Sequence, residues 1–216
     1  CQINKPDPTI EKKYDFIYIC HRDDTNDCSK DEWVAFNKNL GLAEQCFDIL
    51  CGKLNMKGLL IGRAGCKIPD KLKNNLDVTP KLDYHTMNKK YDEAKFIFLP
   101  NVNDASPRVL TEALCHNIPC LVNENIVGGW KYVNDKTGVF FNSIDDIEEK
   151  ATLLSSNLGT YEPRKNFIEN YGVINSGKKL KQFVYEIYGD QINIPESEVL
   201  YLTPEFEKKD YEQCRA

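Results

Sequence analysis

Along residues 14–142, short apolar runs alternate with amphipathic stretches, and this alternation restricts the possible folds more than any other feature. Apolar runs of this length are typical of strands that are buried on both faces of a parallel sheet. Strand–helix–strand order indicates βαβ units. We therefore predict an α/β fold with an open parallel sheet and helices on both faces. The predicted strands are residues 14–20, 57–61, 95–99, 118–122 and 138–141.

The predicted helices lie between these strands and, after residue 142, follow one another without strands. Their ranges are residues 37–54, 84–94, 107–116, 162–171 and 175–188, with another helix opening at the capping signal Ser143-Ile-Asp-Asp. Residues 190–216 differ in composition, with seven acidic and three basic residues and prolines at 195 and 204. We predict a linker-like segment over 1–13, one domain over 14–189 and an acidic arm over 190–216.

Composition and charge exclude several classes of protein. The chain has 216 residues, of which 41% are hydrophobic and 28% charged, as in globular domains. A net charge of −5 argues against sequence-independent binding to nucleic acid. No apolar run approaches the roughly 18 to 20 residues of a membrane helix, and no signal peptide is visible. Because the sequence starts at Cys1, we expect a domain excised from a longer protein.

The nine cysteines contain no CxxC pair, and their number is odd. This spacing predicts neither a disulfide framework nor a zinc site. Most of these cysteines lie in apolar runs, where a free thiol behaves as a small hydrophobic group. There is also no Asn-x-Ser/Thr acceptor for glycans. We therefore expect a reducing, cytoplasmic setting.

The position of a ligand follows from the predicted sheet, because open α/β sheets bind ligands beyond the carboxyl ends of their strands. The residues at these ends are His21-Arg22, Gly62-Arg63, and the ranges 100–106 and 123–129.

The most informative stretch is residues 98–114, FLPNVNDASPRVLTEAL. We predict Ser106 as the N-cap of a helix and Pro107 as its first residue. A helix N-terminus at the end of a strand favours a phosphate group. Arg108 and Glu112 lie four residues apart on the face opposite the apolar one, so an exposed ion pair between them is an equally good interpretation of the spacing alone.

This stretch resembles the donor-binding signature of family 4-like retaining glycosyltransferases of the GT-B architecture. The signature has two acidic residues eight positions apart, here Asp104 and Glu112, followed by Ala-Leu and by NIPCLV at 117–122. GGW at 128–130 and TGVF at 137–140 continue the resemblance. It departs at Asp104, usually glutamate, and at Asn117, commonly glycine. The similarity covers residues 14–188 and implies the Rossmann-like C-terminal half of such an enzyme, followed by C-terminal helices.

The resemblance implies roles for individual residues. Glu112 would bind the ribose hydroxyls of a nucleotide sugar, and Asp104 the transferred sugar; ionised carboxylates can accept hydrogen bonds from both hydroxyls of a diol. Arg22 and Lys38 would neutralise the diphosphate, with Lys30 as the alternative lysine. Further predicted binding residues are Ser106, Arg108, Gly62, Arg63, Gly128 and Gly129, the last two because glycines let the backbone approach the sugar.

The implied activity is transfer of a sugar from a nucleotide-diphosphate sugar to an unknown acceptor with retention of anomeric configuration. Enzymes of this type use basic residues in place of a bound metal, so the resemblance implies no metal or other cofactor. The expected partners are a nucleotide sugar, a glycan or other acceptor, and an N-terminal acceptor-binding domain or partner chain. One alternative is a nucleotide-sugar-binding or scaffold domain without transfer activity. Another is a related epimerase or phosphorylase, although no histidine occupies a matched position.

Other motifs are weaker. The acidic run at 23–27 resembles a metal loop but lacks the glycine and distal glutamate of a calcium site, so a solvated loop is favoured. His116 and Cys120 lie on a predicted helix end and a buried strand, which disfavours a metal site. IGRAG at 61–65 is an incomplete dinucleotide fingerprint. His85 and Met87 lie on the helix that flanks the base pocket in the family, and we favour plain surface contacts for both.

Overall fold

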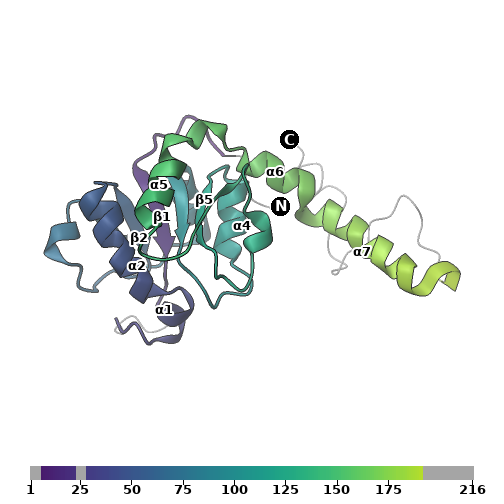
Figure 1. The fold of residues 1–216 in the computed structure, drawn as a ribbon, viewed down its shortest axis with the longest axis horizontal. Helices are drawn as coiled ribbons and strands as arrows, with labels where there is room; N and C mark the ends of the chain where they lie inside the picture. The colour runs from purple at the N-terminus through teal and green to yellow at the C-terminus, as the bar shows by residue number, and fades with distance from the viewer. Residues whose placement is uncertain (1–5, 23–27, 192–216) are drawn as a thin grey trace.

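A computed structural model describes residues 6–22 and 28–191. Its centre is a six-stranded, all-parallel sheet with the order β3-β2-β1-β4-β5-β6, which confirms the predicted α/β Rossmann-like fold (Figure 1). The chain order reverses between β1 and β4, and a ligand crevice is expected at this switch point. The strands are β1 (Tyr14–Ile19), β2 (Gly58–Ile61), β3 (Leu76–Thr79), β4 (Ala94–Leu99), β5 (Cys120–Asn123) and β6 (Gly138–Phe141).

Side chains that alternate along the strands form two separate cores, one on each face of the sheet. In β1, Phe16 and Tyr18 enter one core, whereas Ile17 and Ile19 enter the other. Helices α1 (Trp33–Asn37), α2 (Leu40–Phe47) and α5 (Ile147–Ser156) cover the first core. Helices α3 (Tyr84–Asp92) and α4 (Arg108–Cys115) cover the second. Both faces of the central strands are therefore buried, which explains their long apolar runs.

Two details of the β1-to-β3 region differ from prediction. The helix predicted over 37–54 is three pieces, because Asn39 between α1 and α2 has a left-handed φ of 54°. A π-helical segment, η1 (Asp48–Lys53), follows α2 directly. The edge strand β3, preceded by the 3₁₀ turn η2 (Asp70–Leu72), was not predicted.

The C-terminal part is helical, as predicted. Helix α5 is capped differently, because the Asp146 carboxylate accepts from the backbone N–H groups of Asn142 and Ser143 and Asp146 is itself the N-cap residue. Ser143 therefore does not open the helix. Helix α7 runs away from the sheet (Figure 1). The remaining elements are η3 (Trp130–Tyr132), η4 (Leu158–Thr160), α6 (Pro163–Asn170), α7 (Gly172–Tyr188) and η5 (Gly189–Gln191).

Of the predicted acidic arm, all but Asp190 and Gln191 lies outside the described residues. No described helix is long and apolar enough to cross a membrane.

The expectation that no cysteines pair was wrong, because Cys28 and Cys66 form a disulfide. Disulfides are typical of oxidising compartments, so the expected reducing, cytoplasmic setting loses its support. The other cysteines that the structure describes behave as predicted: five are buried thiols. Burial raises the pKa of Cys46 and of Cys51 to about 12, so both remain neutral thiols. The five are Cys20, Cys46, Cys51, Cys115 and Cys120.

Candidate active site

The carboxyl edge of the sheet carries an ion pair between two of the predicted site residues. Lys38 Nζ lies 2.6 Å from Asp104 Oδ2, and the two side chains are 21% and 16% exposed. Asn101 Nδ2 donates to the same carboxylate oxygen at 3.1 Å. The ammonium group has three N–H donors, so two remain for a ligand. Half-buried and open on one side, this pair can present both a cation and a carboxylate to a bound molecule.

The break between α1 and α2 places Lys38 against the loop that follows β4. Lys38 ends α1, and Asn39 takes the left-handed conformation that Asn tolerates better than most residues. The Asn39 amide then donates to the carbonyl of Pro100 at 3.0 Å, which ties the break to the end of β4. A hollow of about 320 Å³ opens beside Lys38 and Asp104.

The loop from Asp104 to α4 is organised by Asp104 rather than by Ser106. Asp104 Oδ1 accepts from the backbone N–H of Ser106 at 3.2 Å. Helix α4 begins at Arg108 with Pro107 as its N-cap residue and no side-chain cap. The predicted capping by Ser106 was therefore wrong by one residue, and Pro107 precedes the first helical turn. Ser106, Arg108, Gly129 and Lys131 line a second hollow of about 240 Å³ at this helix end.

The paired glycines after β5 allow two loops of the site to touch. A Cβ atom on Gly128 would lie 1.8 Å from the Ala105 carbonyl oxygen, which no side chain could tolerate. Gly129 has φ +82°, and a Cβ atom there would lie 2.6 Å from Pro107 Cγ. Both positions thus require glycine for loop packing. A closer approach of this backbone to a sugar stays a prediction.

Glu112 does not pair with Arg108, although the structure describes both residues. Its Oε2 instead accepts a hydrogen bond of 2.8 Å from the hydroxyl of Tyr91 on α3. The exposed ion pair that the spacing alone allowed is therefore absent.

Arg22 lies after β1, and its side chain contacts the loop after β2. Its guanidinium donates to the carbonyl of Ala64 and, through Nη1, to the sulfurs of Cys28 and Cys66 at 3.3 and 3.4 Å. The Nε atom is buried and has no hydrogen-bond partner. Arg22 therefore lies beside the disulfide. Its hydrogen bonds go to the disulfide sulfurs and to the loop after β2, and not to the Lys38–Asp104 pair.

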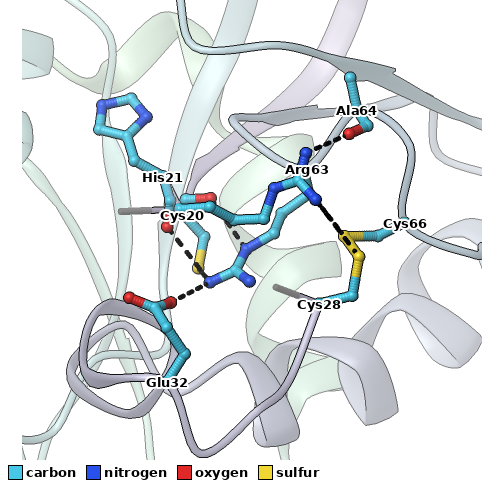
Figure 2. Close-up of a disulfide and its surroundings, with 8 residues drawn as sticks. Cys20, His21, Cys28, Glu32, Arg63, Ala64 and Cys66 are labelled. Atoms are coloured by element: carbon cyan, nitrogen blue, oxygen red, sulfur yellow. Dashed lines mark hydrogen bonds and ion pairs between the residues drawn. A yellow bond between two sulfur atoms is a disulfide. The ribbon is translucent and has the colours of Figure 1, made fainter. Parts of the chain in front are cut away.

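Arg63, predicted to bind a ligand, is 1% exposed and serves as an internal brace. Its guanidinium donates to the carbonyls of Cys20 and His21 and forms an ion pair of 2.9 Å with Glu32 (Figure 2). Glu32 in turn accepts from the first N–H groups of α1. Gly62 makes the turn possible, since a Cβ atom there would lie 2.7 Å from the backbone of His21. We therefore propose no ligand contact for Arg63.

The remaining candidates lie apart from this edge. Lys30 pairs with Glu44 at the surface, so the structure brings Lys38 and not Lys30 to Asp104. His116 bonds to Asp92, and the thiol of Cys120 to the carbonyl of Thr137. Among the described residues, no three His, Cys, Asp or Glu side chains gather as a metal site would require. The acidic run at 23–27 lies outside the described residues.

Of the two candidates on α3, His85 is exposed, as expected for a surface contact, whereas Met87 is not a plain surface residue. His85 makes an edge contact with the exposed ring of Tyr84, and Met87 packs partly buried against the second core.

Sequence reasoning missed three residues that hold the site together: Glu32, Tyr91 and Asn101. Tyr91 begins the sequence YDEAK, which looks like an ordinary polar helix end. Its periodicity gives no sign that Tyr91 contacts a site residue. Asn101 lies two residues after β4, within the range 100–106 where a ligand was expected, and is 1% exposed. Its place at a strand's carboxyl end was the available signal.

No protein family and no curated protein matches the chain by sequence. Solved structures match it by fold. TarM of S. aureus matches with a TM-score of 0.64 and 16% identity over 85% of this chain and 37% of TarM. The lipopolysaccharide outer core galactosyltransferase WaaB gives 0.61 and 14%, over 87% of this chain and 53% of WaaB. The pneumococcal O-GlcNAc transferase GtfA, solved with UDP and GlcNAc, gives 0.59 and 13%, over 87% of this chain and 39% of GtfA.

The structural neighbours are GT-B glycosyltransferases, and this chain has the fold of one part of them. At these identities the comparison establishes the fold and nothing finer. The chain spans 37% to 53% of the length of the three neighbours.

Proposed function

We propose that the chain is the donor-binding half of a retaining, family 4-like glycosyltransferase. The observation that carries the proposal is the Lys38–Asp104 pair beside a hollow of about 320 Å³ at the switch point of the sheet. A cation and a carboxylate side by side suit a ligand that has both a phosphate group and sugar hydroxyls. The nucleotide sugar is such a ligand.

In this proposal the charges of the site act on the leaving nucleoside diphosphate. Negative charge develops on the diphosphate as the glycosidic bond breaks, and fixed cations stabilise it. Lys38 supplies its two remaining N–H donors, Arg22 its positive charge, and the N-terminus of α4 its dipole. Such a site needs no metal cofactor. Retention follows if the acceptor attacks an oxocarbenium-like sugar from the face that the diphosphate leaves.

The same proposal assigns the hydroxyl groups of the donor to carboxylates. Asp104 binds the transferred sugar and Glu112 the ribose. The acceptor, a glycan or another hydroxyl compound, requires a further domain or partner chain, because this chain spans only part of its structural neighbours.

We expect the chain to bind a nucleotide-diphosphate sugar and to unfold at a higher temperature when bound. A ligand that binds only the folded state stabilises it by about 2.7 kcal/mol at a hundredfold excess over Kd. Thermal unfolding with millimolar UDP-GlcNAc, GDP-mannose and ADP-glucose measures the effect, with UDP-GlcNAc first because GtfA was solved with UDP and GlcNAc. An unchanged melting temperature with all three would contradict the proposal.

Glu112→Gln is expected to weaken binding of the preferred nucleotide about tenfold, since hydrogen bonds that involve a charged group contribute about 1.5 to 3 kcal/mol and the amide keeps part of them. The melting temperature without ligand should change little. Titration calorimetry of wild type and variant measures the difference, with Glu148→Gln on the surface of α5 as the matched control. Equal affinities would remove Glu112 from the site.

A nucleotide-sugar-binding or scaffold domain without transfer activity is the second candidate, because the Lys38–Asp104 pair and its hollow would serve binding alone equally well. Hydrolysis of the bound donor, with and without a co-expressed acceptor-binding half, separates the two functions. Donor binding without turnover in either condition would favour the scaffold.

A further inference from the structure

Glu112 is held from behind by a buried tyrosine. Tyr91 is 1% exposed, and its hydroxyl donates to Glu112 Oε2 at 2.8 Å. Burial, together with the nearby Glu112 charge, raises the pKa of Tyr91 well above its ordinary value. The hydroxyl therefore stays protonated and remains a donor to the carboxylate at every pH at which the protein is studied.

A second layer fixes the tyrosine in turn. The Tyr91 ring stacks on His116 with ring centroids 5.1 Å apart and an interplanar angle of 23°. His116 is 2% exposed; its Nδ1 lies 2.8 Å from Asp92 Oδ1 and its Nε2 lies 3.1 Å from Asn88 Oδ1. Three residues of α3 and the C-cap of α4 thus form one bonded unit, which leaves the Tyr91 hydroxyl little freedom to move.

We infer that Tyr91 is a positioning residue, whose hydroxyl fixes the Glu112 carboxylate in the orientation that captures the ribose diol of the donor. The inference rests on the proposed function and deepens it by naming what sets the geometry of the ribose contact.

The chemistry of the carboxylate supports this role. An ionised carboxylate has about four acceptor sites on two oxygens, and Tyr91 occupies one of them. The remaining sites suffice for two ribose hydroxyls. A glutamate side chain without such an anchor has three rotatable bonds, and ordering it on binding would cost affinity. Tyr91 removes much of that cost before the ligand arrives.

The test compares Tyr91→Phe with wild type, because phenylalanine keeps the stacked, buried ring and loses only the hydroxyl. The ligands are UDP, GDP and ADP, each beside its 2′,3′-dideoxy counterpart, measured by titration calorimetry. We expect Tyr91→Phe to weaken the preferred ribonucleotide about three- to tenfold and its dideoxy counterpart less than about twofold. Added to Glu112→Gln, the change should have almost no further effect, as expected for residues that act as a unit.

The matched control is Tyr14→Phe. Tyr14 is also a buried tyrosine with a hydroxyl that bonds to a carboxylate, but that carboxylate is Asp77 on β3 and not Glu112. Removing the Tyr14 hydroxyl should leave the affinities for the ribonucleotide and for its dideoxy counterpart unchanged. If Tyr91→Phe lowers the stability of the fold, a partly unfolded population reduces the affinities for the ribonucleotide and for its dideoxy counterpart equally. The ratio of these two affinities therefore still tests the role of Tyr91.

Three results would overturn the inference. Two of them would leave the proposed function standing, and the third would refute it as well. An equal loss for ribose and dideoxyribose ligands, or no loss while Glu112→Gln binds weakly, would refute the role of Tyr91 and leave the proposed function standing. A wild-type chain that binds none of the three diphosphates would remove the proposed function and the inference together.

Discussion

Replacing Arg63 with methionine is expected to lower the free energy of unfolding by about 3 kcal/mol, because removing one partner of a buried ion pair leaves the other charge uncompensated. Arg63 and Glu32 have side chains only 1% and 9% exposed. The variant also leaves the carbonyls of Cys20 and His21 without their donor. Urea denaturation at pH 7 measures the loss.

The comparison variant is Lys53→Met, which removes a cation of similar length from a surface pair with Glu148 that is 64% and 40% exposed. Its expected effect is below about 0.5 kcal/mol. Similar losses for both variants would mean that the Arg63 brace contributes nothing beyond an ordinary surface pair.

The loss of stability caused by Arg63→Met should also depend on pH. Burial opposes ionisation of Glu32, but hydrogen bonds from the backbone of Val34 and Ala35 and the contact with Arg63 outweigh it and lower the pKa of Glu32. Because its pKa is lower in the folded state, ionised Glu32 stabilises the fold at every pH above its unfolded-state pKa of about 4.3. This stabilisation is lost as the pH falls through the folded-state pKa. The difference in free energy of unfolding between wild type and Arg63→Met should therefore be largest at pH 7 and become smaller in acid.

Removing either predicted diphosphate cation, by Lys38→Ala or Arg22→Ala, should weaken binding of a nucleoside diphosphate about tenfold to a hundredfold. Binding of the uncharged nucleoside should change little, because a cation near the phosphates makes no contact with a neutral ligand. The diphosphate effect should also fade as salt rises, since ions screen exposed charges. Titrating UDP, GDP or ADP and its nucleoside at two salt concentrations measures both.

Lys30→Ala is the control, because Lys30 pairs with Glu44 at the surface and not with Asp104. A loss confined to Lys30→Ala would move the role to that lysine. Equal losses for nucleotide and nucleoside in Lys38→Ala would mean that the change disturbed the α1–α2 junction.

Five of the six strands followed from the sequence because both faces of this sheet are covered, which leaves uninterrupted apolar runs such as FIYI and FIFL. The sixth, β3, is a four-residue edge strand, LDVT, whose Asp77 interrupts the apolar pattern. The predicted helix over 37–54 overlooked the break at Asn39, because the apolar positions at helical spacing all follow that residue, in α2 and η1. Local propensity alone does not reveal such a break.

For the site, the family resemblance selected Asp104 and Glu112, and the structure adds what surrounds each of them: Lys38 and Asn101 beside Asp104, and Tyr91 beside Glu112. Arg63 was expected to face a ligand because it follows a strand, but its neighbour Glu32 lies 31 residues away in sequence and draws it inward. The Tyr91–Glu112 contact and the Cys28–Cys66 bond likewise join residues that only the folded chain brings together. Sequence periodicity contains no information on such long-range pairs.

The Cys28–Cys66 bond closes a covalent ring around the chain between them, with a sequence separation of 38. Helices α1 and α2, the segment η1, strand β2, Lys38 and the Glu32–Arg63 pair all lie within the ring. A protease that cuts the backbone once inside it would therefore leave the two fragments joined, and they would separate on a gel only after reduction. The segment that carries Lys38 and β2 thus has its two ends joined twice, once by peptide bonds and once through sulfur.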